Sequence, residues 1–482
     1  MADRTVGRRR LLLGTGVLTA AAVLPSAAPS NAGPVLNARR RAPGKPNFVV
    51  ILADDFGYGQ VGVQGQTKIK TPRIDRMARE GLRFTDAYAA APVCAPARAS
   101  LLTGLHGGHC PVRRNPPDDG DLPLPQGIPT IATVLQGAGY RTGLFGKWGF
   151  GGMLPNPSHP DQHGFSDFFG YLTHFGAKSY YPTRLLDGRK WEYLPGNKGD
   201  TGPVYGPDVI MERALAFVRQ SKDVPFLLML TLPLPHAPSA GPPTLGRYAG
   251  KPWRRPDRVH AAQVTKLDAY VGRMLDALRR NGLDDDTIVI FTGDNGPHEE
   301  GGVRPDFFDS NGKLRGYKRN LYEGGIRVPF IVRSPKLMAR TRGKKTAHQT
   351  VHYDLLATFA DLAGARVPPG TDGLSLAPVF TGRGTVRKHT YLYWSRLHAG
   401  STPSQRAEDG KRGRNAAAAV RFGKWKAVGF APGRGYSTPG SSWKIELYDM
   451  SKDVGEKKDL ASKHPAVVRK ARGYMKAAWR NP

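Results

Sequence analysis

Three short apolar runs in the first 300 residues each end in polar groups that can take part in chemistry. They are residues 48–53 before Asp54 and Asp55, residues 226–230 before a proline-rich turn and His236, and residues 288–291 before Asp294 and Asn295. Continuous apolar runs without alternation are typical of strands buried on both faces of a mostly parallel sheet. Because ligands of such sheets gather beyond the carboxyl ends of the strands, we expect these polar groups to converge on one site.

Apolar residues also recur at helical spacing between the predicted strands. The repeat from Val264 to Leu278 predicts an amphipathic helix, which Asn281-Gly282 ends just before the third strand. Residues 353–362 predict another amphipathic helix. Alternation of strands and helices predicts an α/β fold with right-handed crossovers.

The pattern changes near residue 385. The segments after it predict short strands joined by turns rich in Gly and Pro: residues 390–394, 419–422, 425–428 and 445–448. A closing helix is expected to begin near Pro465, and the polar segment 401–415 predicts a solvated loop. We therefore predict a large α/β domain over residues 33–385 and a small antiparallel sheet with a terminal helix over residues 386–482.

The first 32 residues are typical of an export signal. Arg8, Arg9 and Arg10 precede a short apolar stretch that ends at Leu24, and small residues follow it. Paired arginines before such a stretch indicate a twin-arginine signal peptide, read by the twin-arginine translocase. A stable membrane anchor is disfavoured because Gly and Thr residues and Pro25 interrupt a stretch already short for a membrane span. We expect a bacterial protein that is exported and secreted.

Composition and charge narrow the class of protein. Hydrophobic residues make up 39% and charged residues 23%, which excludes a disordered chain. The excess of 71 Lys and Arg over 39 Asp and Glu gives a net charge of +32, a field that concentrates polyanions. For an exported protein we expect acidic polysaccharide as the partner and no nucleic acid, although a generally basic proteome explains the charge equally well. Two cysteines, Cys94 and Cys110, allow at most one bridge and form no disulfide framework.

Four side chains at the predicted strand ends suit a metal ion. Asp54 and Asp55 cannot share one side of a strand, but at its end the backbone can turn both toward one centre. Asp294 and Asn295 offer a second carboxylate and an amide oxygen at an equivalent position. Oxygen-only ligands select a hard cation, Ca²⁺ or Mg²⁺. Single pairs of this kind usually make turns, but two pairs at matched strand ends favour a metal site.

The segment around Cys94 carries the most specific pattern. Pro96 suits the first turn of a helix, which places Cys94 at the helix N-terminus, where backbone N–H groups favour an anion, with Arg98 one turn further. From these residues alone, a thiolate nucleophile and a buried structural cysteine are both open.

Residues 94–104 read C-x-P-x-R-x-S-L-L-T-G, which resembles the signature of type I sulfatases such as arylsulfatases and N-acetylgalactosamine-6-sulfatases. The resemblance extends over nearly all of the chain after the signal. It implies the alkaline-phosphatase-like fold, a large mixed and mostly parallel sheet flanked by helices. It also implies that a formylglycine-generating enzyme oxidises Cys94 to Cα-formylglycine, whose hydrate attacks sulfur. Asp54, Asp55, Asp294, Asn295 and the modified Cys94 would then hold Ca²⁺, with Mg²⁺ the lesser alternative.

The same resemblance assigns roles to cationic and proton-carrying side chains. Lys147, in a Gly-Lys-Trp-Gly segment, would contact formylglycine and sulfate, and Lys318 would bind sulfate. His236 would donate a proton to the leaving oxygen. Together with Arg98, the two lysines would oppose the charge that develops on the sulfate oxygens.

One position departs from the family pattern. Many relatives carry a His where this chain has Gly149, and that His helps to deprotonate the hydrated aldehyde. Residues 169–182 resemble a subgroup that lacks it. His174 or Lys178 would supply the missing function, with a role as substrate-loop residues as the equal alternative. His298 is expected to support the site from behind the metal pair.

These observations predict an exported, calcium-dependent sulfatase that hydrolyses sulfate monoesters, more of sulfated carbohydrate than of aryl sulfates. Two alternatives stay open. One is a phosphonate monoester or phosphodiester hydrolase of the same superfamily that also uses formylglycine. The other is a catalytically silent, basic protein that binds polyanions. The glycine at position 149 leaves this alternative open, because it cannot do the work of the family His.

Overall fold

The structure is a computed structural model that describes residues 44–116, 122–237, 240–397, 401–436 and 438–480. The predicted signal peptide lies outside these ranges and stays a prediction. None of the helices in the described ranges combines the length and apolar character that a membrane crossing requires.

A ten-stranded sheet forms the centre of the fold, and the three predicted strands lie next to one another in it. β1 (Asn47–Ala53) pairs in parallel with β8 (Phe226–Leu232) on one side and with β9 (Thr287–Gly293) on the other. β4 (Arg141–Lys147) and β5 (Asp167–Tyr171) continue the parallel part beyond β8. Every residue of β1, β8 and β9 is buried, as continuous apolar runs require.

The flanking strands make the sheet mixed. Its order is β11-β2-β10-β9-β1-β8-β4-β5-β6-β7, and antiparallel pairs join β2 to β10, β10 to β9, β5 to β6 and β6 to β7. The bounds of these strands are β2 Leu82–Phe84, β6 Arg184–Asp187, β7 Lys190–Tyr193, β10 Phe330–Arg333 and β11 Lys345–Thr346. A separate pair joins β3 (Ala87–Tyr88) to β12 (Thr350–Val351).

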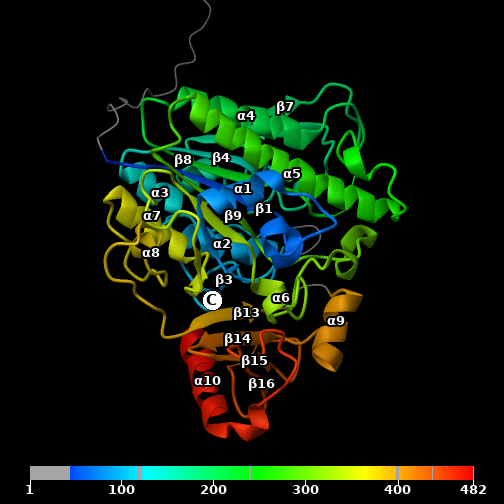
Figure 1. Cartoon of the computed structure of the whole chain (residues 1–482), viewed down its shortest axis with the longest axis vertical. Helices are drawn as coiled ribbons and strands as arrows, with labels where there is room; N and C mark the ends of the chain where they lie inside the picture. The colour runs from blue at the N-terminus through cyan, green and yellow to red at the C-terminus, as the bar shows by residue number, and fades with distance from the viewer. Residues whose placement is uncertain (1–43, 117–121, 238–239, 398–400, 437, 481–482) are drawn as a thin grey trace, which may run out of the picture. The chain divides into compact units, whose positions relative to one another are not determined.

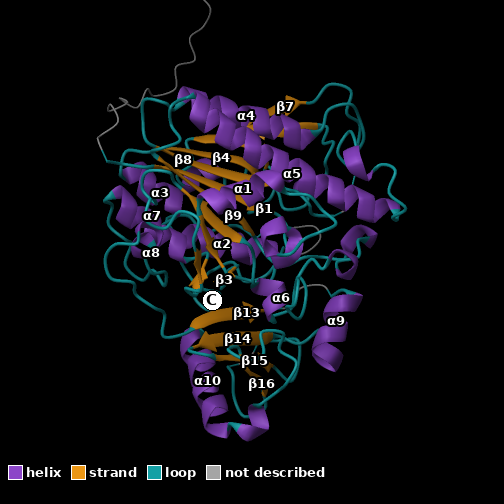
Figure 2. Ribbon diagram, viewed as in Figure 1, coloured by secondary structure: helices purple, strands orange, loops and turns teal. Residues whose placement is uncertain are grey.

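Helices cover both faces of this sheet (Figure 2). Val49 and Ile51 of β1 belong to one apolar layer and Phe48, Val50 and Leu52 to the other, because neighbouring strand residues point to opposite faces. The first layer contains α1 (Pro72–Glu80), α4 (Gly206–Gln220) and α5 (Arg255–Arg280), and the second contains α2 (Cys94–Thr103), α3 (Ile131–Gly137) and α7 (Asp354–Ala363). The α/β prediction is confirmed, as are the helices expected before the third strand and at residues 353–362.

Short elements lie between the longer ones throughout the described chain. The α-helical ones are α6 (Glu323–Ile326) and α8 (Ala377–Thr381). The 3₁₀ turns are η1 Tyr58–Gln60, η2 Gly62–Gln64, η3 Pro160–His163, η4 Gly176–Lys178, η5 Gly246–Tyr248, η6 Glu300–Gly302, η7 Asp306–Phe308, η8 Gly410–Arg412 and η9 Ala461–Lys463.

The carboxyl-terminal part is a four-stranded antiparallel sheet in chain order, followed by a helix, as predicted. Its elements are β13 (Leu392–Arg396), β14 (Ala417–Phe422), β15 (Trp425–Phe430), β16 (Lys444–Asp449) and α10 (Pro465–Ala478) (Figure 1). The indole N–H of Trp394 donates to the Ala89 carbonyl at 2.8 Å, which ties this sheet to the segment that directly follows β3. The domain boundary at residue 385 stays a prediction.

The prediction of a solvated loop over residues 401–415 is wrong. The segment contains α9 (Pro403–Asp409), and Asp409 at its end is fully buried. Asp409 forms an ion pair with Arg396 of β13 and accepts a hydrogen bond from Asn320 Nδ2 at 2.9 Å. Gln405 and Asp409 are therefore buried by polar partners while most of the segment stays at least partly exposed, which composition alone does not reveal.

Candidate active site

The carboxyl end of β1 turns two adjacent carboxylates toward one centre. Asp55 has a φ of 62°, a left-handed conformation that is uncommon for a residue other than glycine. This turn cancels the usual alternation of side chains, so Asp54 Oδ1 and Asp55 Oδ1 lie 3.2 and 3.6 Å from the Sγ of Cys94. The nucleophile predicted at the start of α2 thus faces the acidic pair predicted at the end of β1.

The end of β9 adds the second predicted pair. Asp294 Oδ1 accepts the backbone N–H of Asp55 at 2.9 Å, and Asn295 Nδ2 donates to Asp55 Oδ1 at 2.7 Å. Asn295 Oδ1 is buried and has no hydrogen-bond partner among the described residues. A buried acceptor normally has a partner, so this amide oxygen beside carboxylates fits a hard cation. Four oxygen-bearing side chains from two neighbouring strands therefore meet as expected.

The electrostatics of this cluster also suit a cation. Burial, and then the negative charge of Asp54, raise the pKa of Asp294 to about 7. Four side chains each offer one possible ligand atom, and these atoms lie within 4.8 Å of one another: Asp54, Asp55, Cys94 and His236. Several buried carboxylates close to one another need positive charge nearby.

Three buried cations surround the acidic cluster. Lys147 Nζ donates to Asp54 Oδ2 at 2.7 Å, and Lys318 Nζ donates to Asp55 Oδ2 at 2.7 Å. Arg98 Nη2 lies 2.9 Å from Asp294 Oδ2 and 3.3 Å from Asp54 Oδ2. Burial by itself would raise the pKa of Asp54, but the charges of Lys147 and Arg98 outweigh it and hold that pKa well below its usual range.

His236 lies at the border between this cluster and the solvent-facing pocket. Its Nε2 is 3.3 Å from Lys318 Nζ and 3.5 Å from Asp55 Oδ2. Burial, and then the charge of Lys318, lower the pKa of His236 to about 4, so the imidazole is neutral at neutral pH. His298 stacks on it with ring centroids 6.0 Å apart and contacts the Pro235 carbonyl at 3.1 Å, and its expected supporting role stays a prediction.

The departure at Gly149 has a structural counterpart. Gly149 has a φ of 84°, and a Cβ built on it would lie 3.7 Å from Lys147 Cε and 4.0 Å from His174 Cα. His174 is buried, and burial followed by the charge of Lys147 holds its pKa well below the ordinary value. Lys178, one turn away in η4, places its ammonium 4.1 Å above the Phe175 ring.

A pocket of about 370 Å³ opens over the cluster. Its lining residues are Asn115, Pro116, His174, Phe175, Lys178, His236, Ala237, Glu300, Gly301, Lys318 and Arg319. Four of them, His174, Lys178, His236 and Lys318, were predicted from the sequence.

Sequence reasoning missed Asn115 and Glu300. Asn115 Oδ1 accepts the backbone N–H of Ala95 at 3.0 Å and so caps the start of α2. Glu300 accepts from Lys318 Nζ at 3.1 Å and from Arg319 Nη2 at 2.6 Å. Glu300 follows the Asp294-Asn295 pair closely in sequence, but a charged loop residue gives no sign of which way it faces.

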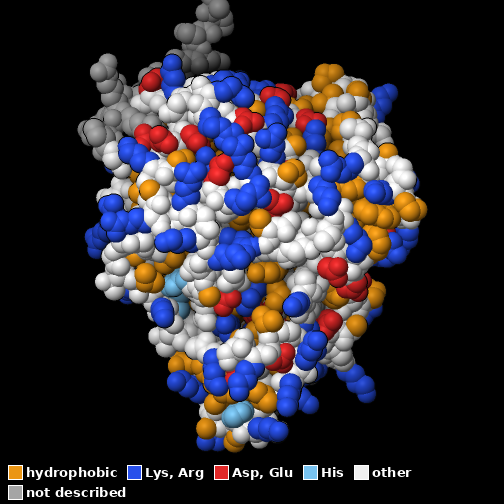
Figure 3. Space-filling model, in the orientation of Figure 1, with side chains coloured by type: hydrophobic (Ala, Val, Ile, Leu, Met, Phe, Trp, Pro, Cys, Tyr) orange, Lys and Arg blue, Asp and Glu red, His pale blue; other side chains and the backbone are white. Residues whose placement is uncertain are grey.

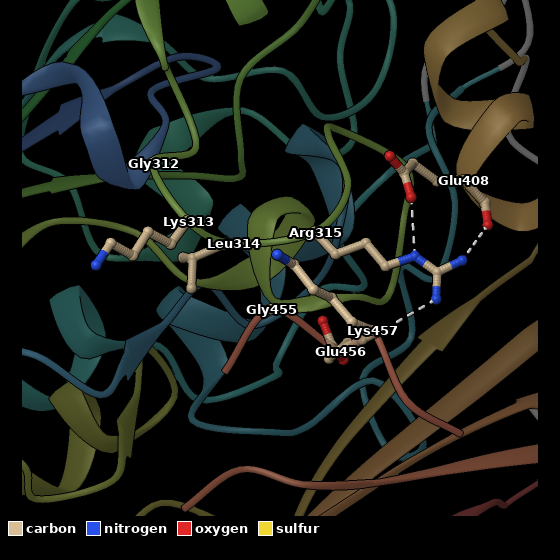
Figure 4. A pocket seen from close by; sticks show the side chains of 8 residues that line it. All are labelled: Gly312, Lys313, Leu314, Arg315, Glu408, Gly455, Glu456 and Lys457. Atoms are coloured by element: carbon tan, nitrogen blue, oxygen red, sulfur yellow. Dashed lines mark hydrogen bonds and ion pairs between the residues drawn. The ribbon is translucent and has the colours of Figure 1, made fainter. Parts of the chain in front are cut away.

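A second hollow, of about 500 Å³, lies beside the loop that leads to Lys318 (Figure 4). Arg315 reaches across it and donates to Glu408 Oε2 at 2.8 Å, to the Tyr448 hydroxyl at 3.1 Å and to the Glu456 carbonyl at 3.2 Å. Arg315 thereby fixes the segment that carries Lys318 against α9 and the end of β16.

The cysteines do not bridge. Cys94 and Cys110 are both buried free thiols. Burial, and then the nearby Asp294 and Asp54 charges, raise the pKa of Cys94 well above the ordinary value. A neutral buried thiol is a weak nucleophile, so a plain thiolate does not suit this site.

The family of the chain follows from comparison with known proteins. A family model described as Sulfatase matches residues 46–365, and one described as N-sulphoglucosamine sulphohydrolase, C-terminal, matches residues 315–472. Human arylsulfatase A is 33% identical over 449 residues, which cover 86% of this chain and 83% of that protein. Human N-acetylgalactosamine-6-sulfatase is 33% identical over 374 residues, which cover 70% of this chain and 66% of that protein.

A solved structure agrees with these relatives. The crystal structure of Ps i-CgsB in complex with k-i-k-neocarrahexaose is 28% identical, with a TM-score of 0.74 over 91% of this chain and 94% of that one. The chain belongs to the sulfatase family and is a sulfuric ester hydrolase, which confirms the resemblance read from residues 94–104.

Proposed function

We propose that this protein is an exported sulfatase that uses formylglycine and Ca²⁺ to hydrolyse sulfate monoesters of sulfated carbohydrate. The observation that carries the proposal is the position of Cys94, whose Sγ lies 3.2 Å from Asp54 Oδ1 inside a cage of three buried cations. A formylglycine-generating enzyme would modify this residue, and the twin-arginine translocase would export the protein.

Formylglycine supplies an oxygen nucleophile that the buried Cys94 thiol cannot provide, and Ca²⁺ supplies positive charge beside it. Asp54, Asp55, Asp294 and Asn295 would hold the ion through oxygen atoms, the ligands that Ca²⁺ prefers. The unpaired Asn295 Oδ1 supports this assignment, because it offers an acceptor that no described residue satisfies.

The cations stabilise charge on the sulfate group. Arg98, Lys147 and Lys318 already lie in one shell around the acidic cluster, so little reorganisation accompanies the reaction. His236 lies on the pocket side of Lys318, where the alcohol part of the ester must leave. Its imidazole is neutral at neutral pH, so it would donate to the leaving oxygen only after it has taken up a proton, for example one released by the nucleophile.

His174 is the better candidate for the function lost at Gly149. Its Cα lies 4.0 Å from the position that a Cβ at residue 149 would occupy, so its imidazole and that of the missing His arise from neighbouring backbone. Lys178 lies further along the same turn and instead packs on Phe175.

Three observations favour a carbohydrate substrate. Relatives of the chain include N-acetylgalactosamine-6-sulfatase, and Ps i-CgsB was solved with k-i-k-neocarrahexaose. The net charge of +32 favours polyanions, and Figure 3 shows Lys and Arg side chains spread over the visible face.

Cysteine substitution with mass spectrometry tests the proposal. The protein, co-produced with a formylglycine-generating enzyme, should show an aldehyde in the peptide that contains Cys94 and should release sulfate from sulfated saccharides. Cys94→Ala should abolish turnover at an unchanged Tm, whereas the matched variant Cys110→Ala should keep both the aldehyde and turnover. Sulfate release by Cys94→Ala, or faster turnover of phenylphosphonate esters than of 4-nitrophenyl sulfate, would overturn it.

A further inference from the structure

We propose that Glu300 selects substrates in which the group next to the sulfate ester is a hydrogen-bond donor, and rejects those that carry a second anionic group there. This inference rests on the proposed function and goes beyond it, because it names the chemistry of the substrate around the scissile bond.

Glu300 lies on the leaving-group side of the site. The pocket that it lines contains His236 and Lys318 but not Cys94, Asp54 or Asp55. Lys318 Nζ contacts both Asp55 Oδ2, at 2.7 Å, and Glu300 Oε2, at 3.1 Å, so Glu300 lies on the pocket side of the ammonium that would hold the sulfate group. In this proposal the sugar ring enters through the pocket and so passes Glu300.

The carboxylate of Glu300 is held in one position by two cations. Its Oε2 accepts from Lys318 Nζ at 3.1 Å and its Oε1 accepts from Arg319 Nη2 at 2.6 Å. The charge of Lys318, partly offset by burial and reinforced by Arg319, holds the pKa of Glu300 far below its ordinary value. Glu300 is thus a fixed negative charge at neutral pH.

The carboxylate of Glu300 is more exposed than the two cations that bind it, which line the same pocket. The Glu300 side chain is 30% exposed, whereas Lys318 is 3% and Arg319 is 12% exposed. Arg319 has a φ of 79°, a conformation uncommon for a residue other than glycine, and its backbone N–H donates to the Pro92 carbonyl at 2.9 Å. This backbone contact fixes the residue whose guanidinium binds Glu300 Oε1.

An ionised carboxylate accepts hydrogen bonds and cannot donate them. A hydroxyl or ammonium group on the atom next to the sulfated one therefore finds an acceptor at Glu300. A second sulfate or a carboxylate at that place meets a like charge, which opposes binding. The substrate class that fits is a sulfate ester with a free vicinal hydroxyl or amine.

Two small probes separate these cases without knowledge of the sugar: catechol monosulfate, with a hydroxyl beside the ester, and catechol disulfate, with a second sulfate there. The formylglycine-bearing protein should prefer the monosulfate. Glu300→Gln keeps the shape of the side chain but removes its charge, and should shift the ratio of kcat/KM values toward the disulfate by about tenfold or more. Glu300→Asp, which retains the charge, should stay within about threefold of the wild-type ratio.

Glu299→Gln is the matched control, because Glu299 binds the backbone N–H of Ser404 at 2.8 Å and does not line the pocket. If Glu300 only positions Lys318 and Arg319, Glu300→Gln will lower kcat/KM by the same factor for both probes. The ratio of the two kcat/KM values then stays unchanged, and this result overturns the inference. A wild-type protein that carries the aldehyde yet releases sulfate from no ester overturns the proposed function itself, and this inference with it.

Discussion

His174 lies beside the place that a side chain at Gly149 would fill: its Cα is 4.0 Å from the position of a Cβ built on that glycine. Both residues border Lys147, whose Nζ binds Asp54 at 2.7 Å. A histidine at position 149 or at position 174 would therefore place its imidazole in the same part of the site, next to Lys147.

His174→Ala should lower kcat by about 10² with a smaller change in KM, because a neutral buried imidazole can accept a proton during turnover. Steady-state kinetics on a sulfated saccharide measures this. Lys178→Ala is the comparison, since Lys178 lies on the same turn, and its kcat should fall less. A larger loss in Lys178→Ala would assign the function to the lysine instead.

Lys318→Met should lower kcat/KM for sulfate esters by about 10²–10³, because it removes the buried charge that we propose to bind the sulfate oxygens while keeping the length of the side chain. Tm measured alongside shows whether the loss of the ion pair with Asp55 also destabilises the fold.

Lys313→Ala is the control for charge alone. Lys313 is an exposed lysine five positions earlier, at the rim of the hollow beside Arg315. Its removal should leave kcat/KM within about twofold, since exposed charges far from the chemistry contribute little. Equal losses in the two variants would mean that general charge, and not the Lys318 contact, governs turnover.

Removal of calcium should abolish turnover and lower Tm. Three buried carboxylates and the unpaired Asn295 oxygen gain a common partner when the ion binds, and a ligand that binds only the folded state stabilises it by about 2.7 kcal/mol at a hundred times its Kd. Dialysis against a chelator, followed by titration with Ca²⁺ or Mg²⁺, measures both effects. Full activity in protein shown by elemental analysis to be free of metal would contradict the assignment.

Glu456 makes the stability of the fold depend on pH. Burial, opposed by Lys426 but reinforced by Glu323, raises the pKa of Glu456 to about 7 from an ordinary value of 4.5. The folded state therefore holds a proton that the unfolded state releases between these values. Its stabilising contribution is complete below about pH 4.5 and is lost as the pH rises through 7. Glu456→Gln should flatten the fall in Tm between pH 5 and pH 8.

Glu446→Gln should behave in the opposite way. Burial would raise the pKa of Glu446, but hydrogen bonds from Tyr322 and Tyr448 lower it, so its contribution is present at neutral pH and is lost as the pH falls through the lowered pKa. This variant should change Tm mainly on the acid side. An unaltered slope between pH 5 and pH 8 in Glu456→Gln would show that Glu456 is not the group responsible.

Much of the fold was predictable because the apolar pattern depends on burial. The runs at β1, β8 and β9 have no polar alternation, and a strand with both faces covered by helices needs none. The segment 401–415 misled this reasoning, because Asp409 is polar and yet buried through an ion pair with Arg396. Ion pairs between residues distant in sequence produce no periodic pattern of polar and apolar positions, so the sequence does not predict them.

The sequence by itself determined the chemical types at the site: the cysteine before a helix, the two pairs of oxygen ligands, and the family that this spacing identifies. Only the tertiary structure decided which charges meet there. Glu300 and Lys318 are 18 positions apart, and their contact, in which the carboxylate is more exposed than the ammonium, depends on how the segments after β9 fold back on each other. Side-chain direction in loops is set by long-range contacts, which a linear pattern does not record.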